Sequence, residues 1–349
     1  NYQVASEPDK EKMFRGYSAL INSLDCGATT KITIFNHKMS QINFEKSILM
    51  PMQWDGLDDY REEYNQMLLD KATNGNGIVQ EKFLTVSVRK KDVDAARSFF
   101  ARVEADLSAH FAALGSTCGP MNAMERLQIL HRFYRRGEEN EFRFSLRDSA
   151  RKGHSFRDYI CPDSVERHSD FLQIGERYAR VLYLKDYASY IKDSMILELT
   201  DLNRRMMLSI DMIPVPTDEA VREVENKLLG VETNVTNWQR RQNSNQNFSA
   251  VVPYDLEQQR KETREMLDDL TTRDQRMLFA VVTLVHLADS KEELDSDTET
   301  LQSIARKHLC QLAKLSFQQQ DGLVTALPLG LRRIDALRTL TTEALAVLM

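Results

Sequence analysis

The sequence has little cysteine and no long hydrophobic run. Its 349 residues include four widely spaced cysteines that form no CxxC pair: Cys26, Cys118, Cys161 and Cys310. This spacing favours reduced thiols over a disulfide framework. The longest apolar run, at residues 277–288, contains His286 and is too short to span a bilayer. We therefore expect no transmembrane span in this chain, and any membrane association would depend on a partner or on a further segment.

A phosphate-binding loop is also missing from the sequence. Such loops need glycine, because backbone N–H groups must approach the anion closely. None of the 13 glycines opens a GxxxxGK[ST] motif, and no GxGxxG occurs. No GxSxG nucleophile turn is found either. The sequence therefore predicts no cofactor and no catalysis by this chain alone. An independent enzyme is the weakest of three hypotheses, and a thermal-shift screen against nucleotides and divalent metals would test it.

Candidate metal ligands have the wrong spacing. His154, Cys161 and His168 lie seven residues apart, unlike the close ligand pairs of zinc sites. Residues 295–299 (DSDTE) begin like a calcium loop, but Arg306 stands where the final bidentate glutamate belongs. Acidity at a helix N-terminus explains this stretch better. We therefore expect no metal site.

The chain has no excess of positive charge. Its 46 Lys and Arg residues stand against 52 Asp and Glu, which gives a net charge of −6, whereas nucleic-acid modules are usually basic. Basic residues gather at residues 126–136 (RLQILHRFYRR) and 238–241 (WQRR). Arginine beside an aromatic residue can bind phosphates or bases, but it is also typical of protein interfaces. The net charge ranks protein contact above nucleic acid.

The N-terminal part of the chain alternates predicted helices and strands. Strand 29–36 alternates apolar and polar residues, as expected of a half-buried strand. One predicted helix places Leu57, Tyr60, Tyr64 and Met67 on one face. The periodicity predicts helices at residues 6–24, 55–72, 92–114 and 123–135, and strands at residues 29–36 and 83–88. Beyond residue 137 the pattern weakens. We assign an N-terminal α/β subdomain to residues 1–140 and a linker to residues 141–169.

The C-terminal part predicts a β-α-β unit, a helical insertion and a second β-α-β unit. The strands are expected in residues 171–187, 206–213, 277–287 and 309–317, and the helices in residues 189–203 and 290–305. This order matches a ferredoxin-like split βαβ sheet. We therefore predict an α+β fold with a ferredoxin-like subdomain at residues 170–336. A helical hairpin is inserted at residues 217–272, and no RecA-like motor domain is expected.

The insertion carries a heptad seam. Its apolar residues lie three and four positions apart: Val221, Val224, Leu228, Val231, Val235 and Trp238. Gln242 and Asn245 continue the register, and Pro253 begins a second helix. Two arrangements are open: the hairpin projects from the sheet, or it lies flat on it. The candidate interaction residues are Val231, Val235, Trp238, Arg240 and Arg241.

Many separate stretches of the chain resemble one known family. They are residues 25–35 (DCGATTKITIF), 67–79 (MLLDKATNGNGIV), 187–196 (YASYIKDSMI), 213–226 (IPVPTDEAVREVEN), 230–243 (GVETNVTNWQRRQN), 248–261 (FSAVVPYDLEQQRK), 270–282 (LTTRDQRMLFAVV), 294–301 (LDSDTETL) and 337–349 (LRTLTTEALAVLM). Together they resemble the N-terminal region of the conjugative-transfer ATPases of type IV secretion systems, in the branch found on integrative conjugative elements of Gram-positive bacteria.

The resemblance implies a protein that positions a motor. In that family the segment similar to residues 337–349 leads to a P-loop motor, so ATP and Mg are expected only in a missing motor domain. The chain begins at Asn1 and ends inside an apolar run, and we expect it to be a fragment. The implied location is cytoplasmic, peripheral to the inner face of the cell membrane. The implied partners are secretion-channel and inner-membrane proteins, with self-association of the full-length protein, whose family motors are typically hexameric.

Our leading hypothesis is an assembly and docking region without catalysis of its own. The alternative is a DNA-contacting module that guides substrate to the motor. Binding that depends on Arg240 and Arg241 and falls steeply with salt would favour the alternative.

Overall fold

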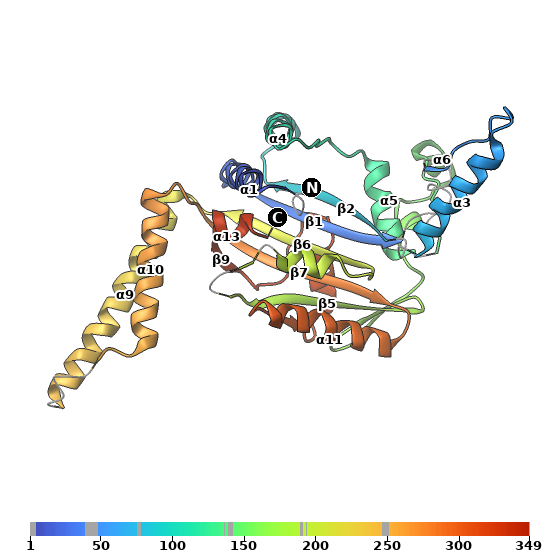
Figure 1. Cartoon of the computed structure of the whole chain (residues 1–349). Coiled ribbons are helices and arrows are strands. Elements are labelled where there is room, and N and C mark those ends of the chain that lie inside the picture. Colours follow the sequence, from blue (N-terminus) through green and yellow to red (C-terminus); the bar gives the residue numbers. More distant parts are fainter. Residues whose placement is uncertain are drawn as a thin grey trace.

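The computed structural model describes residues 5–38, 48–74, 78–135, 137–138, 142–188, 191–192, 194–245 and 251–348. It combines helices with one antiparallel sheet, as expected for an α+β fold. Figure 1 shows a broad, twisted sheet with helices on both faces and a long helical hairpin that extends away from one end. Among the described helices, none is long and apolar enough to cross a membrane.

The helices are α1 (Glu7–Asn22), α3 (Asp58–Asn74), α4 (Val93–Ala113), α5 (Ala123–Tyr134), α6 (Leu146–Lys152), α7 (Arg157–Ile160), α8 (Ser194–Thr200), α9 (Thr217–Ser244), α10 (Tyr254–Thr272), α11 (Lys291–Lys307), α12 (Gln319–Ala326) and α13 (Thr342–Ala346). Local sequence explains where several of them begin. Ser6 accepts a hydrogen bond from the backbone N–H of Asp9, and Asp92 accepts one from Ala95. Asn122 forms a reciprocal capping box at the start of α5.

The strands are β1 (Ala28–Lys38), β2 (Ile78–Val88), β3 (Val165–Arg167), β4 (Leu172–Ile174), β5 (Arg177–Asp186), β6 (Met206–Pro214), β7 (Met277–Ala288), β8 (Gln311–Lys314) and β9 (Arg338–Thr341). Their order is β2-β1-β6-β7-β5-β4-β3, while β8 pairs with β5 and β9 pairs with β7. Every pairing is antiparallel. Strands from both halves of the chain therefore join one sheet, although the domain division at residues 141–169 stays a prediction.

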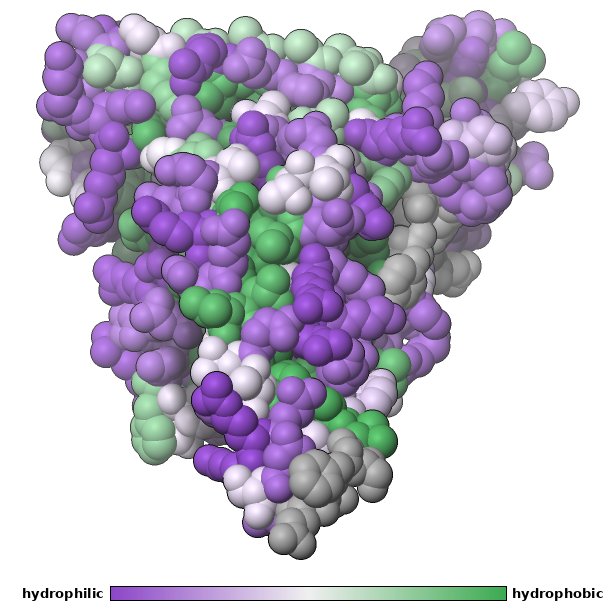
Figure 2. Space-filling view, turned by 90° about the vertical axis from the view of Figure 1, so that its left-hand side faces the viewer, coloured by the Kyte–Doolittle hydropathy of each residue, from purple (hydrophilic) through white to green (hydrophobic). Residues whose placement is uncertain are grey.

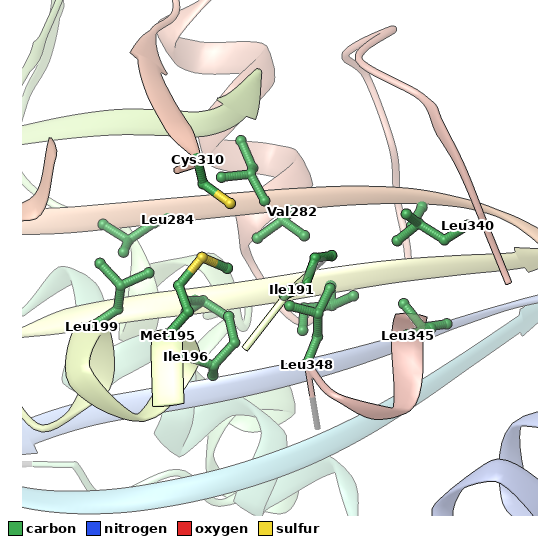
Figure 3. Close-up of a cluster of buried hydrophobic side chains, with 14 of the residues drawn as sticks. Ile191, Met195, Ile196, Leu199, Val282, Leu284, Cys310, Leu340, Leu345 and Leu348 are labelled. Carbon is green, nitrogen blue, oxygen red and sulfur yellow. The ribbon is translucent and has the colours of Figure 1, made fainter. Parts of the chain in front are cut away.

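Two apolar layers enclose the sheet. On one face, residues of α1, α8, α11 and α13 pack against β5, β6 and β7. Figure 3 shows part of this layer, with Met195 and Leu199 of α8 gathered near Leu284, and Leu345 near Leu340. On the other face, α5 and α12 supply Leu130, Phe133 and Leu323, among others. Because both faces are covered, β7 is buried at nearly every position, which confirms the central strand predicted at residues 277–287.

Three secondary-structure predictions need correction. Strand β1 is not half-buried, since Lys31, Thr33 and Asn36 are buried as well as its apolar residues. The face of β1 that was expected to meet solvent is covered by α12 and by the segment that follows it. The contacts of Lys31 with residues 325–331 show this. Strand β8 is not the last strand, because α12, β9 and α13 follow it. Helix α8 is shorter than predicted. The described part of residues 141–169, where the sequence showed only weak periodicity, contains α6, α7 and β3.

Candidate interaction surfaces and buried polar groups

Helices α9 and α10 form an antiparallel hairpin, which we call the arm, and the arm projects from the sheet (Figure 1). At its base, Val215, Val224 and Leu270 pack with Met277 of β7 in a separate apolar cluster. Farther out, Glu232 of α9 and Arg264 of α10 form an ion pair at 2.5 Å. Of the two arrangements that the sequence left open, the structure has the projecting one.

The heptad seam is the internal interface of the arm. Val231 and Val235 are buried, with 7% and 3% of their surface exposed. Because the projecting part of the arm consists of α9 and α10, the helix that covers these valines is α10. The expectation that the two valines face a partner is therefore wrong for this structure. Their role is to hold α9 against α10.

The other three candidates lie where a partner can reach them. Arg240 and Arg241 are exposed, and Trp238 is half-buried. At 1.5 Å per residue, Arg240 lies on the order of 35 Å along α9 from the base of the arm. Figure 2 looks onto the side from which the arm projects, and hydrophobic side chains form a broken band down the middle of this face between hydrophilic flanks. Exposed apolar residues of the arm include Leu229 and Tyr254.

The first basic cluster is occupied by contacts within the chain. Arg126 donates to the carbonyl oxygen of Pro328 at 3.4 Å, and Arg132 pairs with Glu81 at 3.0 Å. Arg135 pairs with Glu138 at 2.9 Å, and Arg136 lies outside the described residues. These pairs make the cluster part of the fold, so it offers less free positive charge than the sequence indicated.

A buried cation lies on β1, and the sequence did not predict it. The ammonium of Lys31 lies 3.5 Å from the Asp211 carboxylate on β6, its register partner. Lys31 also donates to the carbonyl oxygens of Thr325, Leu327 and Leu331. Burial lowers the pKa of Lys31 and raises the pKa of Asp211 to about 6. These contacts hold the end of α12 and the following segment against the sheet. The alternation of apolar and polar residues in the strand gave no signal that Lys31 is buried.

A second buried cation lies on β5, which is separated from β1 by the central strands β6 and β7. Arg180 of β5 is fully buried and pairs with Asp170 at 2.9 Å and with Asp295 at 2.7 Å. It also donates to the hydroxyl of Thr298 at 2.8 Å, and that hydroxyl lies 3.1 Å from Nε2 of His286. Burial, reinforced by the neighbouring Arg180, lowers the pKa of His286 to about 3. The acidic start of α11 therefore holds an arginine, in place of the calcium ion that the sequence analysis considered and rejected.

Within the described part of the chain, no three or more His, Cys, Asp or Glu residues form a group that could hold a metal ion. Three of the residues considered above for a metal are engaged elsewhere or exposed: His154 lies 3.4 Å from Asp158, His168 stacks on Phe171, and Cys161 is a free, exposed thiol. All four cysteines are free, as the sequence predicted.

An exposed apolar surface on α3 was likewise not predicted from the sequence. Tyr60 is 70% exposed, and Leu57, Tyr64 and Met67 are also exposed. Their helical spacing is typical of a face that packs on its own domain, but the structure leaves this face in solvent. The preceding residues 48–54, with Trp54, extend the same surface. The run of methionines and tryptophan at residues 50–54 was the signal that could have drawn attention to it.

No family model matches this chain, and neither does any curated protein.

Proposed function

We propose that this chain is the assembly and docking region of a conjugative DNA-transfer ATPase, without catalysis of its own. The observation that carries the proposal is the arm. A two-helix hairpin whose apolar seam is filled internally adds little to the stability of the sheet, yet it holds Trp238, Arg240 and Arg241 far from it. Tryptophan and arginine are the residue types that dominate binding energy at protein interfaces. The many stretches that resemble that ATPase family supply the choice of parent protein.

The proposed partners are secretion-channel and inner-membrane proteins. The chain would then lie in the cytoplasm, peripheral to the inner face of the membrane through these partners, and would also support self-association of the parent protein. We further propose that β5, β6, β7 and β8 form a ferredoxin-like module. Their spatial order β8-β5-β7-β6, the connecting helices α8 and α11, and the insertion of the arm between β6 and β7 support this assignment.

The test compares two charge-reversing variants of α9. Arg240→Glu with Arg241→Glu changes the distal end, whereas Arg222→Glu with Lys227→Glu makes the same charge change near the base, also at exposed positions. The readout is the transfer frequency of donor cells that carry the parent element, together with co-sedimentation of the protein with membranes. We expect the distal variant to lose both and the basal variant to keep both. Equal behaviour of the two variants would remove the docking role of the arm.

The DNA-contacting alternative has a separate readout. The exposed Arg240 and Arg241 are the observation that favours it. In an electrophoretic titration, DNA binding by phosphate contacts falls steeply between 50 and 200 mM salt, in proportion to the number of phosphates neutralised. We expect the purified chain to show no binding at low salt. Salt-sensitive binding that the distal variant loses and the basal variant keeps would favour the alternative.

A further inference from the structure

The loop before α3 holds a tryptophan out in solvent. The side chain of Trp54 is 90% exposed, and its φ of +58° lies in the left-handed region. A residue with a side chain keeps that conformation only where surrounding contacts impose it. Here the carboxylate of Asp58 accepts the backbone N–H groups of Gln53 and Trp54, at 3.0 and 2.9 Å. We call residues 53–58 the Trp54 loop.

An arginine clamps the same loop from α3. Arg61 donates to Asp55 at 2.6 Å and to Asp58 at 2.7 Å. Asp55 in turn accepts the backbone N–H of Leu57 at 3.1 Å. The loop is thus ordered before any partner arrives, and a preorganised loop loses little conformational entropy on binding. Ordering an indole in water has no benefit for folding, which indicates a binding role.

The surface around Trp54 is both apolar and acidic. Large exposed side chains surround the loop: Ile48, Met50, Met52, Leu57, Tyr60, Tyr64 and Met67. Residues 48–71 also contain six carboxylates but only two cations, Arg61 and Lys71, so their net charge is −4. An anionic membrane surface would repel this charge. The matching partner is a protein with an apolar pocket and a positive rim.

The chain itself carries such a pocket. A cavity of about 620 Å³ lies between α5, α6 and α7, and its lining is mostly apolar: Leu127, Leu130, Phe144, Phe156, Ile160 and Leu329. This volume is in the range of pockets that bury aromatic ligands. Residues 142–160, which form one wall, contain five cations and two carboxylates, so their net charge is +3. Within the described residues, none of these five cations forms an ion pair. We call this cavity the α5–α7 pocket.

We propose that the Trp54 loop of one copy of this chain binds the α5–α7 pocket of a second copy. Both surfaces lie at the end of the molecule remote from the arm, where α3 and α6 are seen in Figure 1. A two-fold axis near this end lets each copy insert its loop into the pocket of the other, and such a closed arrangement stops at a dimer. The inference deepens the proposed assembly function, on which it rests, by naming the surface and the partner.

The first test compares two exposed aromatic side chains with left-handed backbone, Trp54 and Phe317, of which Phe317 lies outside the arm, the Trp54 loop and the pocket. Sedimentation equilibrium of the purified chain gives the dimer Kd for the unchanged protein, Trp54→Ala and the control Phe317→Ala. Removing a central tryptophan hot spot is expected to raise Kd by about 30-fold or more, while the control leaves it unchanged. Trp54 is exposed, so the fold should survive, and circular dichroism checks this. A chain that stays monomeric at all concentrations, or a Trp54→Ala variant with unchanged Kd, overturns the inference.

The second test exchanges charges. Asp59→Lys, Glu62→Lys and Glu63→Lys change the net charge of residues 48–71 from −4 to +2. Arg147→Glu, Arg151→Glu and Lys152→Glu change that of residues 142–160 from +3 to −3; all six side chains are exposed. Each variant alone should dimerise at least 10-fold more weakly than the unchanged chain, because like charges meet twice across the two-fold axis. A mixture of the two should form heterodimers, because both contacts then pair opposite charges. Failure of the mixture to associate, or binding of Trp54 to anionic vesicles without self-association, overturns the inference.

Both tests use the purified chain without partners. Loss of this dimer while arm-dependent transfer persists therefore removes the inference and leaves the proposed function. A dimer that forms as described while the distal arm variant behaves like its control removes the docking role and leaves the self-association surface.

Discussion

The strongest prediction concerns the seam of the arm. Replacing both Val231 and Val235 with aspartate should open the distal arm while the sheet stays folded. Each valine is nearly fully buried, and burying a valine side chain is worth about 1.5–3 kcal/mol. The two substitutions therefore remove about 3–6 kcal/mol of apolar burial, before the added cost of desolvating two carboxylates between α9 and α10.

That loss is large compared with the apolar burial that stabilises the distal arm. Beyond the base of the arm, these two valines are the only buried apolar residues of α9 in the described part of the chain. Thr263 is the buried residue of α10 at that distance from the sheet. The cluster at the base, with Val224 and Met277, is untouched by the substitutions. The distal arm should therefore unfold locally, as regions with few buried contacts do.

Hydrogen exchange read by mass spectrometry is the assay. Peptides from residues 228–244 and 254–263 should lose protection by about 100-fold or more, since each 1.4 kcal/mol is tenfold, while peptides from β6 and β7 keep theirs. The control is Asn234→Asp with Asn237→Asp, which adds the same charge at exposed positions of the same turns and should change nothing. Retained protection in the distal arm would refute the assignment of the seam to the α9–α10 interface. Loss of protection in the sheet as well would refute the prediction that the sheet stays folded when the distal arm opens.

Two further predictions concern the buried polar groups. Lys31→Met should lower the free energy of unfolding by about 3–5 kcal/mol, because it leaves the Asp211 carboxylate buried without its paired cation. Urea unfolding measures this loss, and the loss should be smaller in the double variant that also carries Asp211→Leu. Additive losses from the two substitutions would contradict the pairing. His286 stays neutral in the folded chain down to a pKa of about 3, whereas the unfolded chain takes up a proton near pH 6.5. Between these values the unfolded state binds more protons, so this histidine makes stability fall with decreasing pH, by about 2 kcal/mol from pH 6.5 to 5. His286→Gln should make the melting temperature depend less on pH between 6.5 and 5. An unchanged pH dependence would count against a buried neutral histidine.

The sequence predicted the elements whose signals are local. Ser6 and Asp92 are cap residues immediately before periodic helices, and both cap in the structure. The apolar run of β7 and the heptads of α9 were equally direct. Each of these signals depends on residues within one or two turns of one another, so no knowledge of the rest of the chain was needed.

The buried polar groups could not be predicted in this way. Lys31 in an alternating strand is expected to face water. Its burial is acceptable because the Asp211 carboxylate and the carbonyls of residues 325–331, about 180 and 300 positions later, surround the ammonium. Trp54 is the opposite case. Its exposure results from a local network with Asp58 and Arg61, but nothing in a short sequence window shows whether another element covers the indole.

A seam of apolar residues at heptad spacing determines which side chains must be buried, but it leaves open what buries them. Val231 and Val235 could have been covered by a partner protein, by a second copy or by the chain itself, and all three solutions need the same spacing. The structure selects α10 because this second amphipathic helix runs back alongside α9. The expected partner contact of the arm therefore moves from the seam to the outer surface of the hairpin. With the seam occupied, specificity at the arm must come from the side chains left outside it, Trp238, Arg240 and Arg241, and these are the positions at which a partner of the arm should be sought.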